Sequence, residues 1–148
     1  MLFRSRGNVA ENGVERAWDT ESYSTPEIER IAAALVGSIG LIPSASFGDQ
    51  APLFEPIHGS SPSLAGTDSA NPIGSILSAT MMLRDAFGLS LEADWVEQSL
   101  TRVLSAGYRT PDIAEPKARV VGGSVFTEIL REEMQRTFAH AERYGWGV

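Results

Sequence analysis

The chain has 148 residues, of which 43% are hydrophobic and 21% are charged, as is typical of one globular domain and not of a disordered or collagen-like chain. The net charge is −7 with scattered basic residues, which argues against a nucleic-acid surface, and the absence of cysteine excludes disulfides, thiolate metal sites and a cysteine nucleophile. No apolar run approaches the roughly 20 residues that span a bilayer, and no apolar core follows Arg4 and Arg6, so we expect no membrane segment, no secretory signal and a cytoplasmic location.

The first helix is expected after a polar N-terminal stretch. Residues 1–22 contain Gly and Asn and predict a loop. The sequence STPE then gives a helix-start signal, because Ser24 can cap a helix and Pro26 suits its first turn. Gly37 ends this helix, and the apolar residues 38–47 predict a short strand that enters a bend.

A second strand, a long loop and a buried helix are expected next. Residues 51–57 predict the strand, and residues 58–71 are rich in Gly, Ser, Pro and Asp without a hydrophobic pattern, which is typical of a functional loop. Asn71 is a good helix cap, Pro72 suits the first helical position and Gly88 ends the helix. The helix is apolar on most sides and should be buried, through Ile73, Ile76, Leu77, Met81 and Leu83. Three small residues should permit close packing: Ser75, Ser78 and Ala79.

Two further amphipathic helices complete the pattern. The first spans about residues 92–106 and ends at Gly107, a short strand is expected at 118–121, and the last helix starts near Ser124. Their apolar stripes hold Val96, Leu100, Val103 and Leu104 in the first helix, and Phe126, Ile129, Leu130, Met134 and Phe138 in the last. Strands mixed with amphipathic helices indicate an α/β fold.

The loop at residues 58–71 is the best candidate for a ligand site. It leads into a helix N-terminus, where free backbone N–H groups and the positive end of the helix dipole favour a polar or anionic ligand. His58 adds an aromatic face and a donor, and Asp68 adds an acceptor for ribose hydroxyls. The alternative is a turn-rich connection followed by a capped helix, and the residues alone leave both interpretations open.

A long motif runs through this loop. The sequence FEPIHGS at residues 54–60, followed by Ala65-Gly66 and by Ala70-Asn71-Pro72, resembles the signature EPxHGSxPxxAGxxxANP of the isopropylmalate, isocitrate and tartrate dehydrogenase family. GSIGLIPSAS at residues 37–46 resembles the isopropylmalate branch most closely. With the helix at 73–83 and segments at 18–32 and 107–112, the resemblance covers most of residues 16–134.

In that family the loop binds the adenosine half of NAD, and the resemblance implies the same for residues 59–71. His58 and Gly59 would lie against the adenine and ribose, and Asn71 would hydrogen-bond the adenine edge. Glu55 would lie near the inner part of the cofactor site. The residues that the resemblance assigns to cofactor binding are Glu55, His58, Gly59, Ser60, Ser63, Leu64, Ala65, Gly66, Asp68, Ala70 and Asn71.

The loop departs from the family at two positions that bear on the choice between NAD and NADP. Members that prefer NAD usually carry an acidic residue followed by Ile, and NADP-using isocitrate relatives carry Lys and Tyr. This chain has Ser63 and Leu64 there. Ser63 can accept one hydrogen bond from ribose, and we therefore expect NAD. Asp68 could substitute for the usual acid, but it does not lie at that residue's position in the family.

The family's catalytic residues have no counterpart in this sequence. The reaction oxidises a 2-hydroxy acid and releases carbon dioxide, using Mg²⁺ or Mn²⁺ on an Asp pair in a GDxxxD motif, a Lys base and a Tyr acid. The aspartates here are far apart, at positions 19, 49, 68, 85, 94 and 112, and the DKANV and GGIYFG motifs are absent. Lys117, the only lysine, is expected to be a solvated surface charge, and Tyr23 and Tyr108 lack the right context. We therefore predict no catalytic and no metal-binding residue.

The remaining conspicuous residues are expected to be structural. Three tryptophans are predicted to pack or to lie near the terminus: Trp18, Trp95 and Trp146. His140 lacks a second ligand at metal spacing, and Arg109 matches a family position whose role we take as structural.

The resemblance implies two parts: residues 1–36, a loop and helix from the middle of the family's chain, and residues 37–148, the C-terminal part of the cofactor-side domain. It implies NAD-dependent oxidative decarboxylation of 3-isopropylmalate in leucine biosynthesis by a homodimer, with no turnover by this chain alone. The helix at 72–87 would expose apolar surface, because the family's N-terminal strands complete the sheet beneath it. The alternatives are a non-catalytic nucleotide-binding or interaction fragment, and a tartrate or isocitrate dehydrogenase relative.

Overall fold

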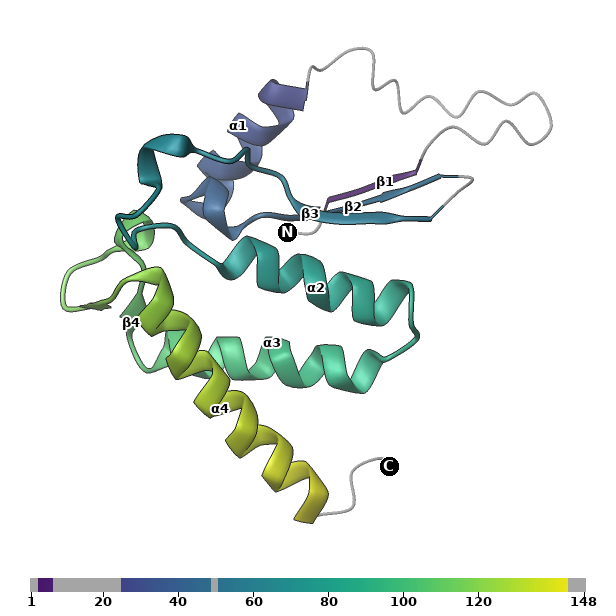
Figure 1. Cartoon of the computed structure of the whole chain (residues 1–148), viewed down its shortest axis with the longest axis vertical. Helices are drawn as coiled ribbons and strands as arrows, with labels where there is room; N and C mark the ends of the chain where they lie inside the picture. The colour runs from purple at the N-terminus through teal and green to yellow at the C-terminus, as the bar shows by residue number, and fades with distance from the viewer. Residues whose placement is uncertain (1–2, 7–24, 49–50, 144–148) are drawn as a thin grey trace.

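The computed structural model describes residues 3–6, 25–48 and 51–143, which form two small sheets and four helices (Figure 1). The first sheet has the order β1-β2-β3, made of β1 (Phe3–Arg6), β2 (Pro43–Phe47) and β3 (Leu53–Pro56). The second pairs β4 (Tyr108–Arg109) with β5 (Arg119–Val120) in parallel. The helices are α1 (Thr25–Val36), α2 (Ile73–Asp85), α3 (Ser90–Ser105) and α4 (Gly123–Arg143). The predicted α/β class is confirmed.

The first sheet corrects two predictions. Residues 3–6, predicted to be loop, form β1, which pairs in parallel with β2 some forty residues later. The sequence FRSR carries no alternating pattern, so only this long-range pairing defines the strand. The strand predicted over 38–47 begins late: residues 39–41 form a 3₁₀ turn, η1 (Ile39–Leu41), and only Pro43 onward is extended. The Ser38 hydroxyl favours the turn, since it accepts a hydrogen bond from Gly40 N at 3.1 Å.

Helix α1 ends as predicted. Gly37 adopts φ +91°, a left-handed conformation that glycine adopts without steric cost, and its N–H bonds the carbonyl of Ala33 at 2.8 Å. The predicted cap Ser24 lies outside the described residues. The helix leaves Ile31 and Leu35 exposed.

Helix α2 packs against β2 and β3 of the first sheet, whereas the resemblance implied exposed apolar surface on the helix at 72–87 (Figure 1). The small residues matter at two places. A Cβ on Gly74 would lie 2.9 Å from the carbonyl oxygen of Gly40, so only glycine permits this approach. Ser78 is buried and accepts a hydrogen bond from Ser44 N at 3.3 Å. The expectation that Ser75 and Ala79 also pack was wrong, because both are exposed.

Helix α3 packs on the side of α2 away from the sheet, and α4 packs on α3, so the three helices form one layer (Figure 1). Its core contains five buried side chains: Ile73, Leu100, Val103, Phe126 and Leu130. Arg84 of α2 is within 2.8 Å of Asp94 and 2.9 Å of Glu97 on α3, so ion pairs join these two helices. The predicted stripes on α3 and α4 are largely confirmed, although Phe138 is 49% exposed.

Helices α3 and α4 also meet through an aromatic pair and a hydroxyl pair. Trp95 packs edge-on against Phe138, with 5.6 Å between ring centroids, which confirms a packing role for this tryptophan. The Ser99 hydroxyl donates to the Thr137 hydroxyl at 3.0 Å. Trp18 and Trp146, and the side chain of His140, lie outside what the structure describes. In the described stretches, every helix is too short or too polar to cross a membrane.

Candidate functional site

The loop between β3 and α2 crosses the surface as an exposed arc. All residues from Gly59 to Asp68 are exposed, including the 3₁₀ turn η2 (Pro62–Leu64), in which Leu64 is 41% exposed. Ser61, Gly66 and Asp68 have positive φ values, so the arc bends sharply. Thr67 closes the turn, since its hydroxyl donates to the carbonyl of Leu64 at 2.8 Å. This loop therefore presents backbone and small side chains to solvent.

The far end of the arc is held on α4 by Asp68. Its two carboxylate oxygens accept hydrogen bonds from Ser124 N at 2.8 Å and from the Ser124 hydroxyl at 2.7 Å. Its carbonyl accepts one from Gly123 N at 2.8 Å. These bonds to Ser124 hold the pKa of Asp68 below its ordinary value. Asp68 thus acts as the N-terminal cap of α4, and its predicted contact with ribose stays a prediction.

Two glycines permit this close contact. A Cβ on Gly122 would overlap the carboxylate of Asp68, and a Cβ on Gly123 would overlap the carbonyl oxygen of Ala70. The backbone of the loop therefore lies directly on the start of α4. No local pattern around this glycine pair in the sequence indicates the contact.

The loop ends at Asn71, which is only 9% exposed. Its side-chain oxygen accepts a hydrogen bond from Ile73 N at 2.9 Å, so Asn71 caps α2 as predicted. The helix begins one residue later than expected, at Ile73, with Pro72 as the flanking residue. The side-chain nitrogen donates to the carboxylate of Asp112 at 2.9 Å. The predicted contact with adenine stays a prediction.

Asp112 joins three segments that are far apart in the sequence. It lies in the 3₁₀ turn η3 (Pro111–Ile113) and accepts hydrogen bonds from the Thr110 hydroxyl at 2.6 Å, from Asn71 and from the Ser38 hydroxyl. Burial raises the pKa of Asp112, but these three donors outweigh it and the pKa falls below its ordinary value. Sequence reasoning missed this cluster, because its members are 41 and 74 residues from Asp112 along the chain.

At the near end of the loop, His58 carries a polar atom in need of a partner. Its Nδ1 lies 3.0 Å from the carbonyl oxygen of Gly59, while Nε2 is buried and meets no hydrogen-bonding group among the described residues. A bound polar ligand would supply this partner only after the ring turns toward the surface, because Nε2 is buried in the free chain. Glu55 is exposed on β3, and its carbonyl accepts a hydrogen bond from the Ser44 hydroxyl at 2.7 Å.

The residues fit a dinucleotide better than a metal ion. His58, the exposed arc and the capped start of α2 follow one another along the chain and offer N–H groups, hydroxyls and one unsatisfied ring nitrogen. The remaining residues that the resemblance assigns are all exposed in the described loop: Ser60, Ser63, Ala65, Gly66 and Ala70. Within residues 3–6, 25–48 and 51–143, no group of three or more His, Asp or Glu side chains could hold a metal. Lys117 is exposed, as predicted.

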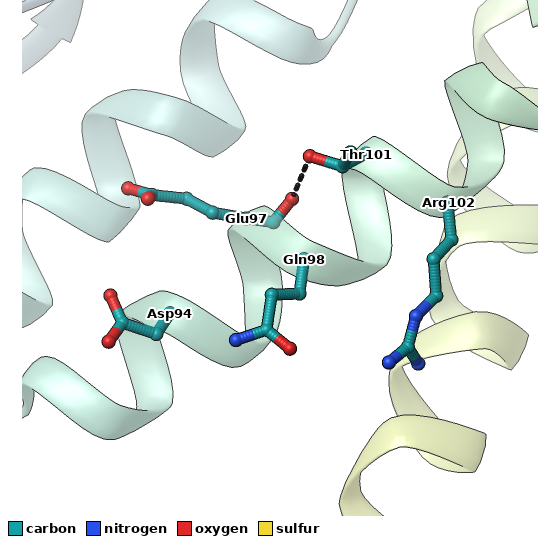
Figure 2. Close-up of a pocket in the computed structure, with 5 residues that line it drawn as sticks. All are labelled: Asp94, Glu97, Gln98, Thr101 and Arg102. Atoms are coloured by element: carbon teal, nitrogen blue, oxygen red, sulfur yellow. Dashed lines mark hydrogen bonds between the residues drawn. The ribbon is translucent and has the colours of Figure 1, made fainter.

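A separate hollow lies on α3, away from the predicted residues. Figure 2 shows its lining, Asp94, Glu97, Gln98, Thr101 and Arg102, all of which come from this one helix. Asp94 and Glu97 are already paired with Arg84. The hollow is therefore an ordinary groove between helical side chains, and none of the predicted site residues lines it.

The sequence over residues 32–130 matches the family model of isocitrate/isopropylmalate dehydrogenase, and the chain belongs to that family of dehydrogenases. Within it, the chain is 52% identical over 104 residues to the 3-isopropylmalate dehydrogenase of Nitratidesulfovibrio vulgaris, a match that covers 70% of this chain and 29% of the relative. It is 45% identical over 105 residues to the 3-isopropylmalate dehydrogenase of Aquifex aeolicus, covering 71% of this chain and 29% of that relative.

Solved structures give the same family. A β-decarboxylating dehydrogenase from Thermococcus kodakarensis superimposes with a TM-score of 0.66 at 34% identity, over 76% of this chain and 32% of the other. An isocitrate dehydrogenase from Methylococcus capsulatus superimposes with a TM-score of 0.64 at 33% identity, over 71% of this chain and 30% of the other. The chain thus spans less than a third of the length of these relatives.

The matched region begins inside α1 and ends inside α4. Residue 32 lies in the second half of α1, so the first turns of this helix precede the match. The resemblance noted for residues 18–32 falls in that preceding part and stays a prediction, as does the division of the chain at residue 36. The loop and both of its anchoring contacts lie within the match.

Proposed function

We propose that the loop at residues 59–71 binds the adenosine half of NAD in a dehydrogenase that oxidatively decarboxylates 3-isopropylmalate in leucine biosynthesis. The observation that carries this proposal is the pairing of an exposed loop, held at its C-terminal end by Asp68 and Asn71, with the buried Nε2 of His58, which has no partner among the described residues. The names of the relatives support the substrate, although the chain spans only 29% of their length.

The start of α2 supplies the electrostatics of such a site. The first N–H groups of a helix are free and carry partial positive charge, which favours the oxygen atoms of a nucleotide. No acidic residue lies in the first turn of α2 itself, while the carboxylate of Asp112 contacts the cap residue Asn71. In the family Mg²⁺ or Mn²⁺ polarises the substrate hydroxyl, and no group of three or more His, Asp or Glu side chains among the described residues fits such an ion.

We propose NAD over NADP on the basis of η2. Its Ser63 and Leu64 are exposed and carry no positive charge, so they offer no ion pair to a 2′-phosphate. The Ser63 hydroxyl can accept one hydrogen bond from the ribose. On the family resemblance and the composition we further propose a cytoplasmic homodimer.

A second candidate is a non-catalytic nucleotide-binding fragment. It is favoured by the position of Lys117, the only lysine, which is exposed beyond β4 and not in the loop at 59–71. Both candidates require the loop to bind NAD, and they differ in whether this chain takes part in turnover. Neither candidate gives turnover by the purified chain alone, so the test adds a chain that carries the missing Lys and Asp pair. NADH formation from 3-isopropylmalate, Mg²⁺ and NAD that requires both chains supports the first candidate, and its absence supports the second.

Calorimetric titration with NAD, and with NADP as the control ligand, tests the binding itself. We expect saturable NAD binding that His58→Ala weakens about tenfold, the loss typical of a hydrogen bond of about 1.4 kcal/mol. Gln98→Ala, an exposed substitution on α3, is the matched control and should bind NAD normally. A folded chain that binds no NAD, or that binds it equally well after His58→Ala, would contradict the proposal.

A further inference from the structure

The side-chain amide of Asn71 is fixed by two contacts of opposite polarity. Its oxygen accepts from Ile73 N at 2.9 Å, and its nitrogen donates to the carboxylate of Asp112 at 2.9 Å. A half-turn of the amide would place its NH₂ group against a backbone N–H and its oxygen against a carboxylate. Both new contacts would be repulsive, so the orientation is unique.

Each contact alone fixes less than the pair. An isolated Asn side chain can exchange its oxygen and nitrogen with little change in shape. The bond to Ile73 N holds the amide oxygen, as in any helix cap. The cap alone leaves the amide nitrogen without a fixed partner, and the bond to Asp112 supplies one. One N–H and one lone pair of the amide remain for another partner.

Asp112 is itself held in place. The Thr110 hydroxyl donates to one of its carboxylate oxygens at 2.6 Å, and the Ser38 hydroxyl donates to the oxygen that Asn71 also contacts. Asp112 itself is exposed, but its neighbours are tightly packed: Thr110 is fully buried, and a Cβ on Gly40 would come within 2.7 Å of the Asn71 side chain. The pKa of Asp112 lies below its ordinary value, so the carboxyl is an ionised, acceptor-only group at neutral pH.

We propose that Asp112 is a positioning residue that orients the amide of Asn71 for recognition of the adenine edge of the dinucleotide. The inference rests on the proposed function, because it assumes that the loop binds NAD. An amide that presents one donor and one acceptor in a fixed order matches the amino group and ring nitrogen of adenine, the pairing that Asn also makes with this base in DNA. The fixed order distinguishes adenine from hypoxanthine, in which a carbonyl replaces the amino group.

The test compares NAD with nicotinamide hypoxanthine dinucleotide by calorimetry. The wild-type chain should prefer NAD by about tenfold, within the range of discrimination given by one amide–base pair. Asp112→Ala should reduce the ratio of the two dissociation constants to near one, and Asp112→Asn should restore it, because the new amide oxygen still accepts from Asn71. Glu115→Gln is the matched control: this exposed carboxylate pairs with Arg109 near Asp112 and should leave the preference unchanged.

The ratio separates positioning from a purely structural role. If Asp112 only stabilised the fold, Asp112→Ala would weaken both ligands equally and keep the tenfold preference, which would overturn the inference. Wild-type chain that binds NAD without preference would overturn it as well while leaving the proposed function intact. If the wild-type chain binds neither dinucleotide, the proposed function fails and the inference with it.

A measurement on the wild-type chain covers the case in which Asp112→Ala does not fold. In a ¹⁵N–¹H spectrum of the ligand-free chain, the Asn71 side-chain amide should show a downfield proton that exchanges slowly with solvent. Fast exchange of both protons, as in exposed amides, would overturn the inference.

Discussion

The helical layer and the loop at residues 59–71 are built in opposite ways. The layer of α2, α3 and α4 buries a cluster of large apolar side chains, each contributing about 1.5–3 kcal/mol when fully buried. The loop is exposed from Gly59 to Asp68 and depends on polar contacts at its C-terminal end, through Asp68 and Asn71. The difference indicates that stability and recognition are separable in this chain: the layer should control unfolding, and the anchored loop should control binding.

The largest expected effect comes from breaking the layer. Phe126 is fully buried in its core, so Phe126→Ala should reduce the free energy of unfolding by about 3–5 kcal/mol through lost burial and a residual cavity. Urea denaturation followed by circular dichroism measures this loss. Val125→Ala, at a neighbouring position that is 49% exposed, is the control and should change stability by less than about 0.5 kcal/mol. Equal effects of the two substitutions would mean that α4 does not pack as described.

A smaller effect should follow from separating the loop and the layer. Gly123→Ala places a methyl group against the carbonyl oxygen of Ala70, and the strain should cost about 1–3 kcal/mol. Hydrogen–deuterium exchange should also accelerate in residues 59–70, because the backbone contact with α4 is displaced. Gly48→Ala is the control, since its Cβ would meet no atom within 4 Å. Unchanged exchange in the loop after Gly123→Ala would contradict the contact.

The smallest expected effect is the pH dependence of stability that comes from Asp68 and its bonds to Ser124. The pKa of Asp68 is lower in the folded chain, so its contribution to stability is present above its unfolded value of about 4 and is lost as pH falls through the folded value. Thermal unfolding at pH 7 and pH 3 should therefore show a smaller acid-induced drop in Tm for Asp68→Asn than for the wild-type chain. Ser124→Ala should give an intermediate drop, because it removes the hydroxyl but keeps the backbone donor. An identical drop in all three chains would contradict this anchor.

Local signals explain which parts of the fold could be predicted from the sequence. Gly37 and Gly107 end helices with positive φ, and the apolar stripes of α3 and α4 follow a 3.6-residue period, so these features depend on neighbours along the chain. Strand β1 could not be predicted, since its polar sequence becomes a strand only by pairing with β2.

In the candidate site too, contacts between neighbours along the chain could be predicted and contacts between distant segments could not. The motif identified the loop and its family, and the cap by Asn71 could be predicted because it acts two residues away. The partners of Asp68 and Asp112 could not, because Ser124 and Ser38 lie 56 and 74 residues from them along the chain. Polar contacts between distant loops leave no periodic pattern in a single sequence.

Hydrogen–deuterium exchange of the wild-type chain with and without saturating NAD tests the central claim most directly. If the anchored loop is the binding surface and the helical layer is only its support, protection should appear in residues 58–71 and around Asp112. Exchange along α3 should stay unchanged, including the hollow formed by Asp94 and Arg102. Protection confined to α3, or no protection anywhere in a chain that is folded, would contradict the account.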